Sequence, residues 1–436
     1  MILGAGGRDF HDFNVAFRDD PGTRVVAFTA AQIPGIDHRT YPPSLAGPLY
    51  PDGIPVIPEA GLPDLLRREA VDEVLLSYSD LSHEQVMHKA SIALAGGAGF
   101  RLLAPASTYL RSVKPVVAVC AVRTGSGKSQ TSRYVAGVLQ AAGLEVVLVR
   151  HPMPYGDLEA MRCQRFATLA DIDASRPTIE EREEYEEPVR RGIVVYAGVD
   201  YEEVLRRAER ECDVILWDGG NNDVPFFAPD LHIAVADALR PDHGSRYHPG
   251  EVNVRLADIV VLNKVDTAGP EATARATEDL RALNPHAELV LASSPVVLDP
   301  GPSLGGRRVL VVEDGPTLTH GGMAFGAATV AARAAGGVII DPRPYAAGAM
   351  ADVFDRYPHL GAVLPATGYS SEQTRDLEET IRRADCDVVV SGTPFDLAHL
   401  IKVDQPMRRA RYELADRGDP RLRDLLQPYI ARWRPE

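Results

Sequence analysis

Residues 116–131 read VVAVCAVRTGSGKSQT and carry the most specific pattern in the chain. β-prone residues run into a glycine-rich turn, and the segment that Lys128 and Ser129 open has apolar side chains at helical spacing. A strand, a glycine-rich turn and a helix in this order are typical of a phosphate-binding loop. Backbone N–H groups at Gly125 and Gly127 can surround a polyphosphate, and Lys128 can reach its outer oxygens.

The predicted nucleotide site departs from the strict loop pattern at one position. G-x-x-x-x-G-K-[ST] requires glycine at position 122, where this chain has Val122. The loop therefore resembles the variant loops of dethiobiotin-synthetase-like P-loop ATPases and GTPases. The alternative is a structural turn with a surface lysine. The predicted nucleotide-binding residues of the loop are Thr124, Gly125, Ser126, Gly127, Lys128, Ser129 and Gln130.

An acidic residue after a second apolar run predicts the metal site. Residues 214–223, VILWDGGNND, place Asp218 at the end of a strand-like segment. A carboxylate there suits the Walker-B role of holding Mg²⁺, with the Ser129 hydroxyl as a further ligand. We expect Lys128 and Asp218 to be catalytic, and Ser129 and Asp218 to bind the metal. The alternative is an ordinary Asp-Gly turn.

A third motif, Asn263-Lys264-Val265-Asp266, follows the apolar run 259–262. In GTPases the Asp of this motif accepts hydrogen bonds from guanine, and the Lys stem lies over the base. We expect Asn263, Lys264 and Asp266 to contact the nucleotide. The motif favours GTP, but Asn263 and Lys264 can also serve adenine, so ATP remains open.

A polar loop follows the strand expected over residues 144–149. Its first residues, Arg150 and His151, are predicted to be catalytic, by binding a phosphate or lending a proton. The alternative is a turn stiffened by the two prolines of residues 150–157.

A basic loop at residues 237–251 is predicted to bind the anionic substrate. Its glycines and prolines exclude a continuous helix, and no His or Cys spacing makes it a convincing zinc site. Glycine-rich turns after two other strands, at residues 4–13 and 313–323, offer further anion sites or are purely structural. The predicted substrate-binding residues are Arg240, His243, Arg246, His248, Arg8 and His320.

Residues 178–187, TIEEREEYEE, contain six glutamates. Thr178 and Glu181 resemble a helix capping box, and such a charge run is usually a solvated helix face. If the run instead faces the nucleotide, its acids can bind metal or hold arginines in place.

Composition limits the functional classes. The 436-residue chain has a net charge of −15, which argues against general binding of nucleic acids or anionic membranes. It has no apolar run long enough for a transmembrane helix and no secretory leader, so we expect a cytoplasmic protein. Its four cysteines are too few and too scattered for a disulfide framework.

Strand-like and helical stretches alternate along the chain, which predicts a multi-domain α/β fold with parallel sheets. We expect a Rossmann-like domain over residues 1–112, a P-loop NTPase domain over 113–304 and a C-terminal α/β domain over 305–436.

Several motifs together resemble cyclic 2,3-diphosphoglycerate synthetases and their bacterial relatives. They are GAGGRDFH (4–11), RTGSGKSQT (123–131), RHPMPYGDL (150–158), TIEEREEY (178–185), WDGGNND (217–223) and NKVD (263–266). The resemblance implies Mg²⁺- and ATP-dependent closure of a phosphoanhydride in 2,3-diphosphoglycerate, releasing ADP and phosphate. It implies a small anionic phosphorylated substrate, and P-loop proteins of this type are often homodimers. The alternative is a GTPase that acts as a regulatory or assembly switch.

Overall fold

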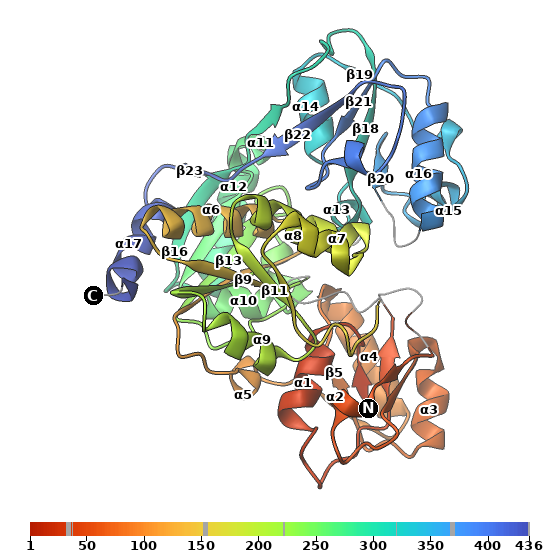
Figure 1. The fold of residues 1–436 in the computed structure, drawn as a ribbon, viewed down its shortest axis with the longest axis vertical. Coiled ribbons are helices and arrows are strands. Elements are labelled where there is room, and N and C mark those ends of the chain that lie inside the picture. Colours follow the sequence, from red (N-terminus) through yellow and green to blue (C-terminus); the bar gives the residue numbers. More distant parts are fainter. Residues whose placement is uncertain are drawn as a thin grey trace.

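The computed structural model describes residues 1–31, 36, 38–150, 156–220, 223–319, 321–366 and 371–434. Figure 1 shows an N-terminal unit at one end of the molecule, a central unit in the middle and a C-terminal unit at the other end. Each unit contains helices around a largely parallel sheet, so the predicted multi-domain α/β class is confirmed. No helix in these described ranges is both long and apolar enough to cross a bilayer.

The central unit is built on a sheet with the strand order β10-β11-β9-β12-β8-β13-β15-β16-β23. Its inner strands are parallel, while β10 and β23 run antiparallel at the two edges. The strands are β8 (Val116–Ala121), β9 (Val146–Arg150), β10 (Gln164–Phe166), β11 (Val194–Ala197), β12 (Val214–Trp217), β13 (Leu231–Asp237), β15 (Ile259–Asn263), β16 (Glu288–Ser293) and β23 (Ala415–Arg417).

Strand β8 is buried along its whole length. Val117 packs on one face of the sheet with Leu139 of the helix that follows, and Cys120 packs on the other face with Trp217. A parallel strand covered on both faces needs a continuous apolar run, which residues 116–121 supply. Because β8 is an inner strand, the glycine-rich turn that follows it lies at the carboxyl end of the sheet, where open α/β sheets bind ligands.

Helices cover both faces of the central sheet. They are α6 (Lys128–Ala141), α7 (Leu169–Ser175), α8 (Ile179–Arg190), α9 (Tyr201–Ala208), α10 (Gly250–Leu256), α11 (Val265–Ala268) and α12 (Pro270–Leu283), with a 3₁₀ turn η2 (His243–Ser245). The predicted capping box of α8 is present, because the Glu181 N–H donates to the Thr178 hydroxyl while the Thr178 N–H donates to the Glu181 carboxylate.

The N-terminal unit has a parallel sheet with an antiparallel edge, in the order β3-β4-β2-β1-β5-β7. Its strands are β1 (Ile2–Leu3), β2 (Phe28–Ala30), β3 (Thr40–Tyr41), β4 (Ile54–Pro58), β5 (Glu73–Leu76) and β7 (Gly99–Arg101). Its helices are α1 (Arg8–Ala16), α2 (Pro43–Ala46), α3 (Leu62–Arg68), α4 (His83–Ala95) and α5 (Pro105–Thr108), with η1 (Glu59–Gly61).

The N-terminal unit docks directly beside the phosphate loop. Strand β6 (Leu81–Ser82) pairs with β14 (Tyr247–His248) of the central unit. Arg123, which opens the loop, pairs with Asp80 of the N-terminal unit at 2.5 Å, and its guanidinium lies 3.8 Å from the centroid of the Tyr247 ring. The loop is therefore held by an ion pair with the N-terminal unit and by a cation–π contact with Tyr247 of the central unit.

The C-terminal unit has the strand order β17-β22-β21-β18-β19, with β20 paired to β18. The strands are β17 (Val296–Leu298), β18 (Arg308–Asp314), β19 (Val338–Ile339), β20 (Leu364–Ala366), β21 (Val388–Ser391) and β22 (Met407–Tyr412). The helices are α13 (Gly315–Thr319), α14 (Ala327–Ala334), α15 (Ala349–Arg356) and α16 (Ser371–Arg383), with η3 (Arg343–Tyr345) and η4 (Leu397–His399).

The last described segment returns from the C-terminal unit to the central one. Strand β23 pairs with β16, and Leu422, Leu426 and Ile430 of α17 (Leu422–Trp433) are buried in the same core as α6. Strand β17 belongs to the C-terminal sheet although it precedes residue 305. The sheets therefore do not follow the boundaries predicted for a domain over 305–436.

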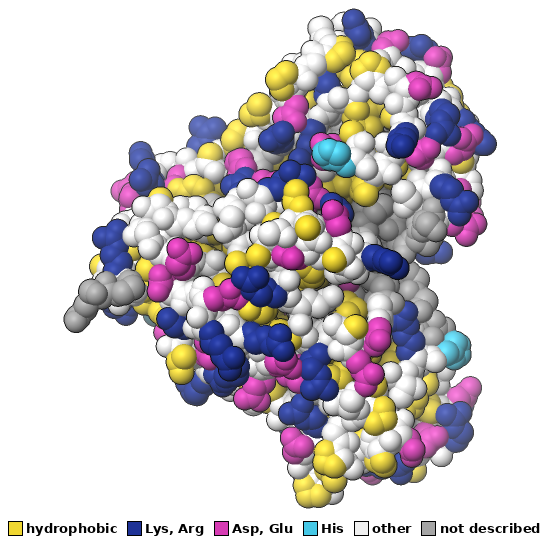
Figure 2. Space-filling model, in the orientation of Figure 1, with side chains coloured by type: hydrophobic (Ala, Val, Ile, Leu, Met, Phe, Trp, Pro, Cys, Tyr) yellow, Lys and Arg dark blue, Asp and Glu magenta, His cyan; other side chains and the backbone are white. Residues whose placement is uncertain are grey.

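Charged side chains of both signs are interspersed on the face of the molecule seen in Figure 2, without a large patch of one sign. On this face, binding of a polyanion would need cations gathered locally rather than a broad basic surface.

Candidate active site

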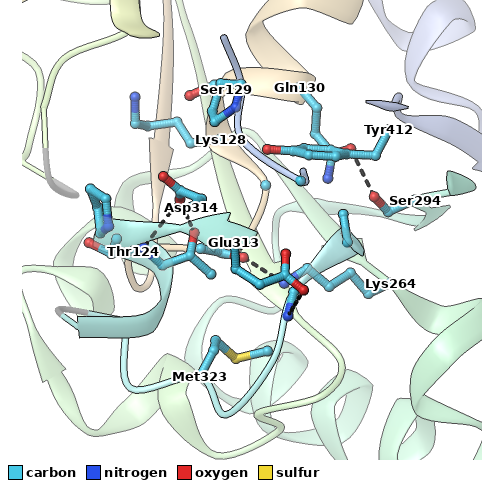
Figure 3. A pocket seen from close by; sticks show the side chains of 18 of the residues that line it. Thr124, Lys128, Ser129, Gln130, Lys264, Ser294, Glu313, Asp314, Met323 and Tyr412 are labelled. Atoms are coloured by element: carbon cyan, nitrogen blue, oxygen red, sulfur yellow. Dashed lines mark hydrogen bonds between the residues drawn. The ribbon is translucent and has the colours of Figure 1, made fainter. Parts of the chain in front are cut away.

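A cavity of about 210 Å³ lies between the central and C-terminal units. The phosphate loop and the start of α6 form one wall, and residues that follow β18 form another (Figure 3). Of the residues predicted from the sequence, those that line it are Thr124, Gly125, Gly127, Lys128, Ser129, Gln130, Arg150, Asp218 and Lys264. The structure thus brings together residues of four segments that are far apart in the sequence.

Two glycines give the phosphate loop its shape. Gly125 and Gly127 have φ values of 81° and 111°, which residues with a side chain rarely adopt. A Cβ on Gly127 would lie 2.2 Å from Asn263 Nδ2 and 2.5 Å from Gln130 Nε2. Glycine is therefore required at position 127 by both backbone conformation and space.

The Asn-Lys-x-Asp motif holds this loop through hydrogen bonds to its backbone carbonyls. Asn263 is fully buried and donates from Nδ2 to the Ser126 carbonyl at 3.0 Å, so that amide is engaged by the loop backbone. Lys264 Nζ donates to the Gly125 carbonyl at 2.5 Å, and its stem lines the cavity. Asp266 is exposed and accepts a long 3.4 Å hydrogen bond from the Ser294 N–H at the same end of the cavity.

Arg240 was predicted to bind substrate, but it holds the loop backbone in this structure. Its guanidinium donates to the Thr124 carbonyl at 3.0 Å and to the Gly321 carbonyl at 2.8 Å. Asp237 pairs with both Arg240 and Lys264, at 3.0 and 2.8 Å. Burial by itself would raise the pKa of Asp237, but these two cations hold it below its ordinary value. Arg240 and Lys264 therefore form a charged support for the loop.

Lys128, Asp218 and Arg150 form a buried charge cluster at the end of the cavity next to the phosphate loop, called the phosphate end below. One Asp218 oxygen lies 2.5 Å from Lys128 Nζ, and the other lies 2.5 Å from Arg150 Nη1. Burial opposes the charge on Asp218, but Arg150 and Lys128 outweigh it and lower the pKa of Asp218 to about 2. Burial and the nearby Arg150 lower the pKa of Lys128 to about 8, against the influence of Asp218. Asp218 is therefore ionised at neutral pH.

The donors at this end fit a magnesium site. The Ser129 hydroxyl stands in the first turn of α6, and Asp218 supplies an ionised carboxylate. Within the described ranges, no three His, Cys, Asp or Glu side chains gather as metal ligands. One carboxylate and one hydroxyl suit Mg²⁺, which keeps water and phosphate oxygens in its shell, better than a metal held by protein alone.

Helix α8 brings its acidic face to the cavity. Glu184 pairs with Arg150, and its side chain is 29% exposed. Glu187, one helical turn later, also lines the cavity and pairs with Arg191 at 3.1 Å. The described part of the glutamate run thus contributes Glu184 and Glu187 to the site, while Glu186 faces Arg182 and Arg190 instead.

The C-terminal unit supplies a wall whose role the sequence did not specify. Figure 3 shows Glu313, Asp314 and Met323 around the cavity. Glu313 is buried and accepts hydrogen bonds from the N–H groups of Ala328 and Thr329, so it caps α14 and is not free for a ligand. A Cβ on Gly125 would lie 3.0 Å from the Thr317 methyl carbon, which shows how closely this unit approaches the loop.

Tyr412 and Arg133 also line the cavity and were absent from the sequence-based predictions. Arg133 follows Ser129 by one helical turn, so its position was visible from helical periodicity. Tyr412 ends β22, and only the tertiary fold brings it to the loop.

Three further predicted substrate residues lie within the described ranges but do not line the cavity, namely Arg246, His243 and His248. Arg246 is exposed and pairs with Asp242 at 3.1 Å. His243 packs against the Tyr247 ring, and His248 takes part in the β14–β6 pairing. Burial lowers the pKa of each of these histidines to about 4. His151 and His320 lie outside the described residues.

Arg8 is buried where the N-terminal and central units meet. Its Nε lies 3.3 Å from Asp12, and Asp223 of the central unit is within electrostatic range. Burial raises the pKa of Asp223 to about 7, while Arg8 and a hydrogen bond from Ser79 act in the opposite direction. The group forms an acidic, buried contact between the units, separate from the cavity.

Comparison with known proteins gives one relative that spans nearly the full chain. The sequence is 56% identical over 430 residues to the arginine synthetase ArcE of Thermococcus kodakarensis, covering 98% of this chain and 96% of that protein. A cyclic 2,3-diphosphoglycerate synthetase of Pyrococcus furiosus matches only 79 residues at 29% identity, 18% of each chain. The resemblance to synthetases is confirmed, but the match to the diphosphoglycerate enzymes is much narrower than the motifs suggested.

No protein-family model matches the sequence. Among solved structures, LpxK from Aquifex aeolicus in complex with ATP is similar at 12% identity and a TM-score of 0.44, covering 80% of this chain and 95% of that chain. The hydrogenase maturation factor HypB from Archaeoglobus fulgidus covers 48% of this chain and 89% of that chain, at 19% identity and a TM-score of 0.26.

Proposed function

Since this chain belongs to the family of the arginine synthetase ArcE, we propose that it is a Mg²⁺- and ATP-dependent synthetase that forms the guanidinium group of arginine. The observation that supports the proposal most directly is 56% identity over 98% of the chain. The cavity adds the chemical support, because it combines a phosphate loop with an ionised carboxylate at its phosphate end.

The first step is phosphoryl transfer to a ureido oxygen. Oxygen is a poor leaving group from a ureido carbon until it is phosphorylated. In the proposed step this oxygen attacks the γ-phosphorus, the bond to the bridging oxygen breaks, and ADP leaves. Lys128 and the N–H groups of the loop stabilise the transferred charge, since such reactions depend on positioning and electrostatics. Mg²⁺ bound near Ser129 and Asp218 would screen the phosphate oxygens.

The second step forms the carbon–nitrogen bond. A nitrogen nucleophile, ammonia in the simplest case, attacks the activated ureido carbon. The carbon–oxygen bond then breaks, phosphate leaves with the bonding electrons, and a guanidinium remains. Walls from both the central and C-terminal units surround the cavity, which would protect the phosphorylated intermediate from water.

Formation of a phosphoanhydride in 2,3-diphosphoglycerate is the second candidate, supported by the shared segment of 79 residues. It uses the same first step, with a substrate phosphate as the acceptor. The charges of the cavity disfavour it, because its described lining has equal numbers of basic and acidic residues. The basic ones are Arg123, Lys128, Arg133, Arg150 and Lys264, and the acidic ones are Glu184, Glu187, Asp218, Glu313 and Asp314. After ATP binds, few cations are left for a bisphosphate.

A switch GTPase is the third candidate and rests on the Asn-Lys-x-Asp motif. In this structure Asn263 and the Lys264 ammonium are engaged by the loop and by Asp237, which leaves Asp266 as the motif's candidate for reading guanine. We propose ATP as the nucleotide.

The test is a product assay with purified protein. Mg²⁺-ATP or Mg²⁺-GTP is supplied with ammonium and the ureido analogue of arginine, in which oxygen replaces one guanidinium nitrogen. Arginine and inorganic phosphate are quantified, and parallel reactions with 2,3-diphosphoglycerate are followed by ³¹P spectroscopy. We expect arginine and phosphate in equal amounts with ATP, and at least a 100-fold lower rate in Lys128→Ala, in line with typical losses of charge stabilisation of ~10² to 10³.

Other outcomes would select the other candidates. A cyclic phosphate product would replace the arginine proposal by the diphosphoglycerate one. GTP hydrolysis that no small substrate stimulates would favour the switch. Full turnover by Lys128→Ala would exclude the phosphate loop as the reaction site.

A further inference from the structure

Glu184 is a carboxylate that pairs with the Lys128–Asp218–Arg150 cluster and is not assigned to the metal. It pairs with Arg150, Arg150 pairs with Asp218, and Asp218 pairs with Lys128. In this series of ion pairs, Arg150 alone therefore stands between Glu184 and the carboxylate assigned to the metal. The Glu184 side chain is 29% exposed and lines the cavity.

Glu184 lies on helix α8, whose N-terminus is held by a capping box. The Thr178–Glu181 capping box closes the first turn, and Tyr185 stacks on Phe166 with ring centroids 4.6 Å apart. Tyr185 is buried in the core, so the neighbouring residue Glu184 is set at the edge of the cavity by packing rather than by exposure alone. A carboxylate positioned in this way can contribute to recognition with little loss of side-chain entropy.

The proposed reaction generates positive charge at the reacting carbon. The substrate ureido group is neutral, but the guanidinium product is a planar cation. Lys128 and Arg150 at the phosphate end would repel that cation. A carboxylate can offset this repulsion and accept two parallel hydrogen bonds from a guanidinium.

Such a group can reach Glu184 because this side chain lines the cavity and is 29% exposed, and its present partner, the guanidinium of Arg150, shows that it can pair with one. Arg150 has a second partner in Asp218, at 2.5 Å, which can retain it when Glu184 engages a ligand. Glu184 is therefore able to exchange one guanidinium for another, or to contact both.

We propose that Glu184 is a specificity-determining residue that binds the guanidinium formed in the reaction and distinguishes it from the neutral ureido group. The inference rests on the proposed function. It assigns to helix α8 the recognition of charge at the reacting carbon, whereas Lys128 and Asp218 act on the phosphate.

The competing explanation is that Glu184 only positions Arg150. Loss of that role would weaken every ligand that depends on Arg150, whether charged or neutral. Direct binding of the guanidinium would make the effect depend on ligand charge. Arginine and its ureido analogue differ by one nitrogen in place of oxygen, so they separate the two explanations.

The experiment measures dissociation constants of arginine and of the ureido analogue by calorimetry, with Mg²⁺-ADP present, for wild type and Glu184→Gln. We expect the substitution to weaken arginine roughly 10- to 100-fold, which corresponds to loss of a hydrogen bond to a charged group. The ureido analogue should change less than about threefold, well below that range. Glutamine keeps the shape of the side chain and removes its charge.

Glu186→Gln is the matched control, because it removes a glutamate from the same helix. Glu186 pairs with Arg182 at 2.7 Å and with Arg190 at 2.8 Å, and it does not line the cavity. We expect it to leave both dissociation constants unchanged. Thermal unfolding of both variants checks that the fold is intact.

Equal weakening of both ligands by Glu184→Gln would overturn the inference and leave Glu184 as a positioning residue for Arg150. The proposed function is then decided separately, and it stands if wild type makes arginine in the product assay. If wild type binds neither ligand and forms no arginine, the proposed function fails, and the assignment of Glu184 fails with it.

Discussion

Asp218 forms ion pairs with both Lys128 and Arg150, two cations that a bound nucleotide would also attract. It is 2% exposed and holds both Lys128 and Arg150, so its carboxylate balances two charges at once. Phosphates would compete for the same cations when a nucleotide binds. Asp218 therefore matters both for stability without ligand and for reactivity with it.

Asp218→Asn should separate these two contributions. We expect phosphate release to fall at least 100-fold, with ~10² to 10³ typical for loss of a charged group at a transition state. We expect stability to fall by about 3–5 kcal/mol, because Lys128 and Arg150 would remain buried without a negative partner. Steady-state phosphate assays and chemical denaturation measure the two effects.

Asp213→Asn is the control on the same segment, at the opposite end of β12 and away from the cavity. It should leave phosphate release unchanged. Wild-type turnover by Asp218→Asn would contradict the assignment of Asp218 to the phosphate end of the site.

The loop at residues 124–130 could be predicted because a glycine-rich turn depends on local spacing, and the structure places most of these residues along the cavity. The charges of the 237–251 loop could not be assigned, because a basic residue looks the same whether it faces a ligand or a carbonyl. Arg240 faces the Thr124 and Gly321 carbonyls, and the latter belongs to another unit. Glu184 remained ambiguous for the same reason, since only the fold places it beside Arg150.

At the scale of elements, Gly127 at the start of α6 and Gly137 inside it differ in whether the structure has room for a side chain. Gly127 caps α6 with a φ of 111°, and a Cβ at this position would lie within 2.5 Å of the side-chain atoms of Asn263 and Gln130. Gly137 lies inside α6, and a Cβ there would meet no atom within 4 Å. One helix thus offers a required glycine and a dispensable one.

Gly127→Ala should lower nucleotide affinity at least tenfold, because the loop must rearrange to relieve the contacts with Asn263 and Gln130. Gly137→Ala, the matched substitution, should leave affinity unchanged and raise stability by about 0.5–1 kcal/mol through helix propensity. Binding of a fluorescent ATP analogue and thermal unfolding distinguish them. Unaltered affinity in Gly127→Ala would show that the loop tolerates a different backbone path.

Most strands with long apolar runs could be predicted, including β8, β12 and β15. Strand β13 was not among the predicted strands, although it lies between β8 and β15 in the sheet. Its sequence, LHIAVAD, places His232 inside an apolar run, and the fold buries that histidine completely enough to lower its pKa to about 4. A polar residue in a buried strand weakens the periodic pattern on which the prediction depends.

At the scale of the whole molecule, neutral histidines lie in the contact between the N-terminal and central units. The His11 ring stacks on Phe226 with centroids 4.3 Å apart, and its Nε2 lies 2.8 Å from the Thr108 carbonyl oxygen. Burial, assisted by Arg8, lowers the pKa of His11 to about 3. The pKa of His248, in the β14–β6 pairing, is shifted in the same direction.

Acidification should therefore weaken the contribution of His11 to this contact. A histidine whose folded pKa is below its unfolded value of about 6.5 contributes its full stability above pH 6.5 and loses it as the pH falls. For His11 the loss at pH 5 is about 2 kcal/mol. Burial raises the pKa of Asp9, Asp12 and Asp223, which act in the opposite direction, so the wild-type profile alone does not isolate His11.

The measurement compares wild type with His11→Gln by chemical denaturation at pH 7 and pH 5. The stability lost between these pH values should be about 2 kcal/mol smaller in the variant, because glutamine does not titrate. His88→Gln, an exposed substitution on α4, is the control and should follow the wild type. Identical pH dependence in His11→Gln would contradict a neutral, buried His11.

The multi-domain α/β class could be predicted from alternating strands and helices, but the crossing of the chain between units could not. Strand β17 pairs in the C-terminal sheet although it precedes residue 305. Strand β23 pairs in the central sheet, and α17 packs in the core of the central unit. Short strands such as β23 have little periodicity of their own. Their pairing partners are chosen by tertiary packing, which local sequence does not record.

The return of β23 and α17 also determines when the protein can finish folding during its synthesis. The ribosome makes the phosphate loop early, but the helix that completes the core beside α6 emerges only after the whole C-terminal unit. Domains commonly fold as units while the chain is still growing. Here the C-terminal unit can fold before α17 is synthesised. The core of the central unit beside α6 is complete only after α17 has been added.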